Sequence, residues 1–209
     1  SEARVAIVWS DTTANFYAGA DAQMIDINKI PNRSAVGNLD AEFNGMADAL
    51  VRSQVPFDVL DDTSLESESL ARYQAIFLPN VACMNDRTAA RLRQYVEQGG
   101  NLIATFETSH YDDTGIHRQD FALADVFGVH SANKIIGPTP WDFIKPVVTM
   151  HKLTRGIGRE LIPTSHYRVI VNASTAQALW RYTVPLKGRY DGVPPVSNDP
   201  ALLVNRVGK

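Results

Sequence analysis

Short apolar runs alternate with helix-like segments through the first half of the chain. The clearest case lies at the centre, where the apolar run Ala75–Leu78 is followed by a segment with one apolar helical face and then by Leu102–Phe106. Asn85 or Asp86 suits the start of that helix, since a short side-chain acceptor satisfies free N–H groups, and Gly99-Gly100 suits its end. Apolar runs without alternation are typical of strands buried on both faces. The pattern therefore predicts a strand–helix–strand unit of a parallel sheet.

The same alternation extends towards the amino terminus. It predicts strands at Arg4–Trp9 and Phe57–Leu60 and a helix at Asp40–Gln54, with a polar loop at Ser10–Thr13 after the first strand. Three further segments complete this half: short helices at Asn15–Ala22 and Leu65–Ala71, and a loop at Ile25–Leu39.

The second half of the chain has a different pattern, with more proline, glycine and short apolar runs. We predict a helix at Asp120–Phe127, little regular structure from Ser131 to Pro146 and a long loop at Val184–Pro200. Four short strands are expected, at Val147–Met150, Arg168–Asn172, Ala176–Arg181 and Ala201–Asn205. The order of elements predicts an α/β three-layer sandwich with a parallel sheet and a β-rich C-terminal part. We expect one domain over residues 1–209, with a core at 4–130 and a loop- and strand-rich part at 131–209.

Composition narrows the range of functions. The chain has 209 residues, 44% of them apolar, and a net charge of −3, so there is no electrostatic argument for binding nucleic acid or an anionic membrane. No apolar run approaches the roughly 20 residues of a membrane-spanning helix. The single cysteine excludes an internal disulfide and a cysteine zinc cluster, and is compatible with the cytoplasmic location that we expect. Phosphate-binding glycine motifs are absent from the sequence, so no cofactor is expected.

Several segments together resemble a known family. They are FNGMADALVRSQVPFDVL, YQAIFLPNVACMNDRTAARLRQYVEQGGNLIATFETSHYDDTG, DFALADVFGV and DPALLVNRVGK. The chain resembles the class I glutamine amidotransferase-like fold, which is flavodoxin-like. More closely, it resembles the β-galactosidase trimerisation domain, the middle domain of family 42 glycoside hydrolases.

The resemblance implies a role in assembly. In that family the domain follows a barrel that carries two catalytic carboxylates, helps to assemble the oligomer and can wall the sugar site of a neighbour. The resemblance thus implies a homo-oligomer, a carbohydrate ligand and a domain excised from a longer protein. The family's last strand normally follows a glycine- and lysine-rich turn, and this chain stops at Gly208-Lys209, so we expect that strand to be missing.

The candidate pocket residues follow predicted strands, because function in parallel sheets lies at the carboxyl ends of the strands. They are Ser10, Asn80, Cys83, Glu107, Ser109, His110 and Tyr111. Glu107 takes the place where the resembling amidotransferases hold their nucleophilic cysteine. A carboxylate is far less nucleophilic than a thiolate, so we assign no catalytic residue. Glu107 either faces a pocket, where it binds sugar hydroxyls or reaches a partner's active site, or holds loop N–H groups as a structural carboxylate.

Two further features have alternative interpretations. His110, Asp112, Asp113 and His117 form H-x-D-D-x-x-x-H, whose side chains could bind a divalent metal. That spacing matches no established zinc motif and the central residues suit a turn, so we expect a surface loop and no metal. Cys83 is expected to be a small apolar side chain, because no histidine follows it at a telling spacing.

Loop aromatic residues offer sugar-stacking surfaces or caps for the core. They are Tyr111, Trp141, Phe143, Tyr167 and Tyr190. Our leading hypothesis is a non-catalytic amidotransferase-like domain of a carbohydrate-active enzyme that serves oligomer assembly and shapes a sugar pocket. The alternative is a stand-alone enzyme, amidotransferase-like or trehalose-utilisation-like, that works from the pocket around Glu107. A third hypothesis is a plain sugar-binding module, which needs an aromatic platform at the strand ends.

Overall fold

The computed structural model describes residues 3–17, 36–157, 161–186, 188 and 192–208. The chain forms two compact units, which are described separately. The first comprises residues 1–123 and 207–209, and the second comprises residues 124–206. The prediction of a single domain with a division after residue 130 stays a prediction.

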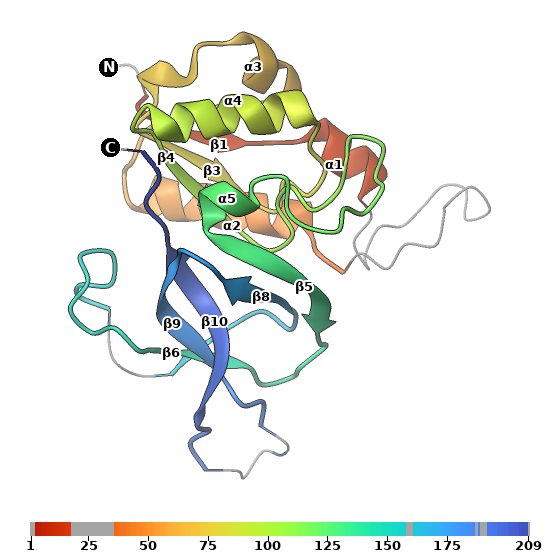
Figure 1. The fold of residues 1–209 in the computed structure, drawn as a ribbon. Coiled ribbons are helices and arrows are strands. Elements are labelled where there is room, and N and C mark those ends of the chain that lie inside the picture. Colours follow the sequence, from red (N-terminus) through yellow and green to blue (C-terminus); the bar gives the residue numbers. More distant parts are fainter. Residues whose placement is uncertain (1–2, 18–35, 158–160, 187, 189–191, 209) are drawn as a thin grey trace. The chain divides into compact units, whose positions relative to one another are not determined.

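The first unit contains a four-stranded parallel sheet (Figure 1). Its strands are β1 (Val5–Val8), β2 (Phe57–Leu60), β3 (Ala75–Leu78) and β4 (Asn101–Ala104), in the order β2-β1-β3-β4. Ile7, Ile76 and Leu78 in the two central strands are completely buried, as their uninterrupted apolar runs predict. The helices are α1 (Asp11–Phe16), α2 (Leu39–Arg52), α3 (Asp62–Ser67) and α4 (Asp86–Glu97), with a 3₁₀ turn, η2, at Leu70–Arg72. Figure 1 shows α3 and α4 on one side of the sheet and α2 on the other.

Helix α4 confirms the central prediction in detail. The Asn85 side chain accepts a hydrogen bond from the Thr88 N–H at the start of the helix. Leu92 and Tyr95 are buried on the predicted apolar face. The helix ends before Gly99, whose φ of +100° suits glycine. Side-chain capping and one apolar face thus place this helix on the sheet.

Other boundaries in the first unit differ from the predictions. Ser10–Thr13 is not a loop: α1 begins at Asp11 because the Ser10 hydroxyl accepts a hydrogen bond from the Thr13 N–H. In the same way, Asp61 caps α3, which starts at Asp62 and not at Leu65. Strand β4 ends two residues early, since Phe106 has a φ of +51°. The expected helix over residues 15–22 and the loop over 25–39 lie largely outside the described residues.

The second unit is mostly antiparallel. Strands β10, β9, β6 and β7 form one sheet in that order, and β5 pairs with β8. The elements are α5 (Ala124–Phe127), β5 (Val129–Ile136), β6 (Phe143–Pro146), β7 (Ile162–Pro163), β8 (Arg168–Ala173), β9 (Gln177–Thr183) and β10 (Val196–Val204). Leu179 and Trp180 of β9 are buried. The expected strands at 168–172, 176–181 and 201–205 are confirmed.

Several predictions for this unit are wrong. Residues 131–136 and 143–146 are not irregular, because β5 pairs with the distant β8 and β6 pairs with β9, and only residues 137–142 between them lack regular structure. Residues 147–150 are not a strand, and Met150 is 92% exposed. The loop expected over 184–200 gives way to β10 at Val196, and the helix expected from Asp120 starts only at Ala124. The missed strands β5 and β6 have pairing partners that are distant in the sequence, which local patterns do not report.

The mixed α/β architecture, with a parallel sheet followed by antiparallel strands, is confirmed. The flavodoxin-like assignment stays a prediction. Within the described residues, none of the helices combines the length and the apolar character that a bilayer crossing requires.

Candidate functional site

Glu107 lies at the centre of a buried polar cluster in the first unit. Its side chain is 2% exposed. The Tyr17 hydroxyl donates a hydrogen bond of 2.8 Å to Glu107 Oε2, and the Tyr111 hydroxyl lies 3.4 Å from Oε1. The Gly37 N–H in turn donates to the Tyr17 hydroxyl at 2.9 Å. Side-chain hydroxyls, and not loop N–H groups, hold this carboxylate.

Both tyrosines in the cluster are held as neutral donors. Burial, and then the charge of Glu107, raise the pKa of Tyr17 far above its ordinary value. The same two causes, in the same order, raise the pKa of Tyr111. A protonated phenol can donate its O–H to the carboxylate. Both tyrosines therefore act as neutral hydrogen-bond donors to Glu107, and neither acts as a base.

A sharp turn after β4 positions Glu107. Phe106 and Ser109, on either side of it, have φ values of +51° and +65°. The Glu107 N–H donates to Asn80 Oδ1 at 3.2 Å, and the His110 N–H donates to the Glu107 carbonyl at 2.9 Å. The left-handed backbone at Phe106 starts this turn, and the turn directs the Glu107 carboxylate into the protein.

His110 and His117 lie beside this carboxylate. His110 is 2% exposed, and its Nδ1 lies 3.4 Å from Glu107 Oε1. The ring centroids of His110 and His117 are 4.1 Å apart. Burial, followed by the neighbouring His110, lowers the pKa of His117, while Glu107 acts in the opposite direction. The fold therefore brings together the two histidines of the H-x-D-D-x-x-x-H segment.

The aspartates of that segment do not join them. Asp112 Oδ1 accepts hydrogen bonds from the Thr114 N–H, the Thr114 hydroxyl and the Ile116 N–H. Asp113 is exposed. The segment is a turn, as expected for Asp-Asp-Thr-Gly, and Asp112 is used to close it.

The remaining predicted site residues have structural contacts. Ser10 caps α1, and the Ser109 hydroxyl accepts a hydrogen bond from the Leu123 N–H at 3.3 Å. Asn80 is completely buried with a φ of +46°. Cys83 packs in an apolar cluster with Tyr17, Ala82 and Tyr111. These contacts explain the burial of Ser10, Ser109 and Cys83 without invoking a ligand, whereas Asn80 Nδ2 is buried without a hydrogen-bond partner among the described residues.

The cavity at the carboxyl ends of the strands is separate from the Glu107 cluster. It has a volume of about 290 Å³ and is lined by Cys83 and by the acidic side chains Asp62, Glu66 and Asp113, among others. Of the seven predicted site residues, Cys83 alone lines this cavity. The predicted pocket is therefore divided into a cavity and a buried cluster.

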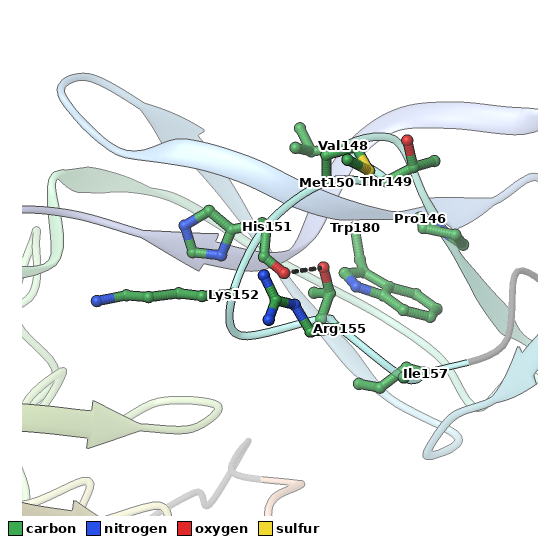
Figure 2. A pocket seen from close by; sticks show the side chains of 11 residues that line it. Pro146, Val148, Thr149, Met150, His151, Lys152, Arg155, Ile157 and Trp180 are labelled. Atoms are coloured by element: carbon green, nitrogen blue, oxygen red, sulfur yellow. Dashed lines mark hydrogen bonds between the residues drawn. The ribbon is translucent and has the colours of Figure 1, made fainter.

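A second cavity, of about 250 Å³, lies in the second unit (Figure 2). It lies over Trp180 and is formed largely by residues 146–157. The Thr154 hydroxyl closes this loop by donating to the His151 carbonyl at 3.2 Å, and Lys152 extends away from Trp180 in Figure 2. No residue predicted for the site lies here.

Among the described residues, the loop aromatic side chains do not gather into one surface on which a sugar ring could stack. Tyr111 is buried against Glu107, Phe143 belongs to strand β6, and Trp141 is 41% exposed. Tyr190 lies outside the described residues.

Comparison with known proteins identifies the family. The model of the family described as the β-galactosidase trimerisation domain matches residues 3–209. The chain belongs to the β-galactosidase trimerisation domain family. The family resemblance inferred from the sequence is thereby confirmed, while its amidotransferase-like part stays a prediction.

Solved structures share the fold of this trimerisation domain. The β-galactosidase from Bacillus circulans sp. alkalophilus has a TM-score of 0.74 and 18% identity, over 99% of this chain and 27% of that chain. The cold-adapted β-galactosidase from Rahnella sp. R3 has a TM-score of 0.73 and 18% identity, over the same shares. A curated relative, the exo-β-D-glucosaminidase of Pyrococcus horikoshii, is 36% identical over 59 residues, which is 28% of this chain and 8% of that protein. The chain thus spans about a quarter of the solved enzymes and less of the curated one.

Sequence reasoning missed two members of the buried cluster in this trimerisation domain. Tyr17 comes from the segment after α1, 90 residues before Glu107, and no periodicity links the two. His117 was considered with the aspartates of its loop and not with Glu107. Pairing across loops brings both to the carboxylate, and the only sequence signal was the concentration of polar residues after the fourth strand.

Proposed function

We propose that the chain is a non-catalytic domain of a glycoside hydrolase and that it assembles the enzyme into an oligomer. The observation that carries this proposal is the match to the trimerisation domain family over residues 3–209. The β-galactosidases from Bacillus circulans sp. alkalophilus and Rahnella sp. R3 have similar solved structures, and this chain spans about a quarter of the length of each. The domain would therefore act together with a catalytic domain.

The Glu107 cluster supports a non-catalytic role. The carboxylate is 2% exposed and accepts a hydrogen bond from Tyr17, and it does not line the neighbouring cavity. A residue that attacks or activates a substrate must reach it within hydrogen-bond distance. These contacts do not favour a stand-alone enzyme that works from Glu107.

The proposal also includes a contribution to a sugar-binding pocket. The solved relatives are β-galactosidases, so we infer a β-linked sugar as the substrate class of the parent protein. Trp141, which is 41% exposed, is the side chain that we propose for stacking on a sugar ring. The cytoplasmic location stays a prediction from the single cysteine.

Sequencing the complete reading frame is the first test. We expect it to encode a barrel upstream of this chain, with two acidic residues at the ends of its strands. A frame that encodes no catalytic domain would contradict the accessory role.

Sedimentation velocity of the complete protein tests assembly. We expect a trimer, with three times the mass of the subunit, over a range of protein concentrations. A complete protein that stays monomeric at every concentration would contradict the assembly role.

We place one subunit contact on residues 147–157. This segment exposes several apolar side chains, including Met150 (92% exposed) and Leu153 (56% exposed). Clustered exposed apolar side chains are typical of interaction surfaces. Met150→Asp with Leu153→Asp is expected to dissociate the trimer, whereas Val51→Asp, on α2 and 63% exposed, is the matched control. Dissociation by the control alone would place the contact elsewhere.

A further inference from the structure

Three side chains that can ligate a metal converge in the first unit. Glu107, His110 and His117 each offer one ligand atom, and these atoms lie within 4.8 Å of one another. The closest pair, Glu107 Oε1 and His110 Nδ1, is 3.4 Å apart. The separation of this closest pair matches the roughly 3.4 Å between ligand atoms around one tetrahedral zinc ion, each about 2.0–2.2 Å from it.

The strongest sign of a ligand is His110 itself. The residue is 2% exposed, and neither of its ring nitrogens has a hydrogen-bond partner among the residues that the structure describes. Buried polar atoms in folded proteins nearly always have a partner, so an imidazole with two unmet nitrogens calls for one. A metal ion on Nδ1, which faces Glu107 Oε1 at 3.4 Å, supplies a partner for that nitrogen, while Nε2 keeps none among the described residues.

The backbone holds the two histidines in register. The Arg118 N–H donates to the His110 carbonyl at 2.8 Å, and Tyr111 and His117 form an antiparallel bridge. Asp112 closes the intervening turn with its carboxylate. The backbone positions of both histidines are thus fixed by hydrogen bonds that do not depend on a bound ion.

Outer contacts orient the carboxylate. Tyr17 donates to Glu107 Oε2, and Oε1, which the Tyr111 hydroxyl approaches at 3.4 Å, is turned towards His110. Hydrogen bonds of this kind fix ligating carboxylates in metal sites and are nearly as important as the ligands. The exposed ring of His117 makes the site accessible from solvent.

We propose that Glu107, His110 and His117 bind one divalent zinc ion, with a fourth position open to water. Two imidazoles and a carboxylate form a donor set that zinc favours, and three protein ligands leave one coordination position free. The carboxylate in this site comes from the turn after β4, and not from the aspartates between the two histidines. The ion cross-links that turn to the 110–118 loop.

Zinc titration of the tag-free, chelator-treated chain against a chromophoric competitor tests the site. We expect one ion per chain with a Kd of about 1 μM or lower. Co²⁺ in place of zinc should give the intense visible absorption of a tetrahedral site. Absence of stoichiometric binding would overturn the proposal.

Two variants locate the ion. His117→Asn changes an exposed side chain, so the fold is retained, and it is expected to weaken zinc binding at least about 100-fold and to abolish the cobalt spectrum. Asp113→Asn is the matched control from the same loop and should leave both unchanged. Equal loss in the two variants, or none in His117→Asn, would overturn the assignment. Far-UV circular dichroism confirms the folding of each variant.

Discussion

The two units bury ionisable groups in different ways. In the second unit, Arg168 lies between two carboxylates: its side chain is 3% exposed and lies 3.6 Å from Asp142 and 3.4 Å from Asp199. In the first unit, Glu107 receives neutral tyrosine hydroxyls, and His110 keeps ring nitrogens without hydrogen-bond partners in the described part of the chain. The carboxylates around Arg168 compensate its charge, whereas Glu107 and the histidines beside it form a set of groups that can bind a metal.

This difference separates structural from functional burial. The guanidinium of Arg168 also donates to the Thr183 carbonyl and lies over the Tyr182 ring, so it has partners on several sides. Burial raises the pKa of Asp142, and Arg168 counteracts that effect. These contacts compensate the charge of Arg168, as a buried charge requires, although Arg168 Nε and Asp142 Oδ2 are also buried without hydrogen-bond partners among the described residues. The Glu107–His110 pair differs in its donor set, because His117 also converges there, and we therefore assign zinc to this cluster.

The largest effect on stability is expected when the ion pair between Arg168 and Asp142 in the second unit is removed. Arg168→Met leaves the buried Asp142 without its cation, and we expect the free energy of unfolding to fall by about 3–5 kcal/mol. Urea denaturation followed by tryptophan fluorescence measures the loss. Arg181→Met is the control, because Arg181 makes a hydrogen bond to the Asn198 carbonyl at an exposed position.

A double variant sharpens this test. Adding Asp142→Asn to Arg168→Met removes the stranded charge, so part of the lost stability should return. Equal stability of Arg168→Met and the unchanged chain would contradict the role of this ion pair.

A smaller effect is expected in the first unit. Tyr17→Phe removes the hydroxyl that donates to Glu107 and accepts from Gly37, at a cost of about 1.5–3 kcal/mol, the range for hydrogen bonds to charged groups. A cycle with Glu107→Gln, measured by urea denaturation, should show coupling of about 0.5–3 kcal/mol. Tyr167→Phe, in the second unit, is the control and should change stability by less than about 0.5 kcal/mol. Additive effects of the first two substitutions would exclude a functional hydrogen bond between them.

The smallest effect on stability is expected at Glu42, whose carboxylate accepts a hydrogen bond from the neutral Thr105 hydroxyl. Burial raises the pKa of Glu42 above 4.5, and the hydrogen bond from the Thr105 hydroxyl only partly offsets this. The folded state therefore holds the proton more tightly than the unfolded state, and the resulting stability is lost as the pH rises from 4.5 through the folded pKa.

Glu42→Gln removes the ionisation. We expect this variant to be more stable than the unchanged chain at neutral pH, by about 1 kcal/mol or less, with the difference disappearing near pH 4.5. Calorimetric Tm values at both pH values measure the change. Asp48→Asn, which loses only an exposed ion pair with Arg52, is the control and should shift stability little at either pH. A variant that is less stable than the unchanged chain at neutral pH would contradict the buried-carboxylate argument.

The local sequence was sufficient for elements that depend on local contacts. The run Ala75–Leu78 and the capped helix after Asn85 were predicted correctly, because burial on both faces and side-chain capping act over a few residues. The family was likewise evident from these segments. Strand β5 was missed because the hydrogen bonds that stabilise it come from β8, more than 30 residues away.

For the site residues, too, local sequence predicted some positions and contacts between distant segments decided the others. The sequence by itself placed Glu107 and His110 after the fourth strand of a parallel sheet, where polar side chains gather. Only the tertiary structure brought in Tyr17, turned Asp112 into its own loop and set His117 beside His110. Periodicity reports which face of an element is buried, but the direction of a loop side chain depends on backbone hydrogen bonds between distant segments. The chemistry of this cluster was therefore decided by the fold.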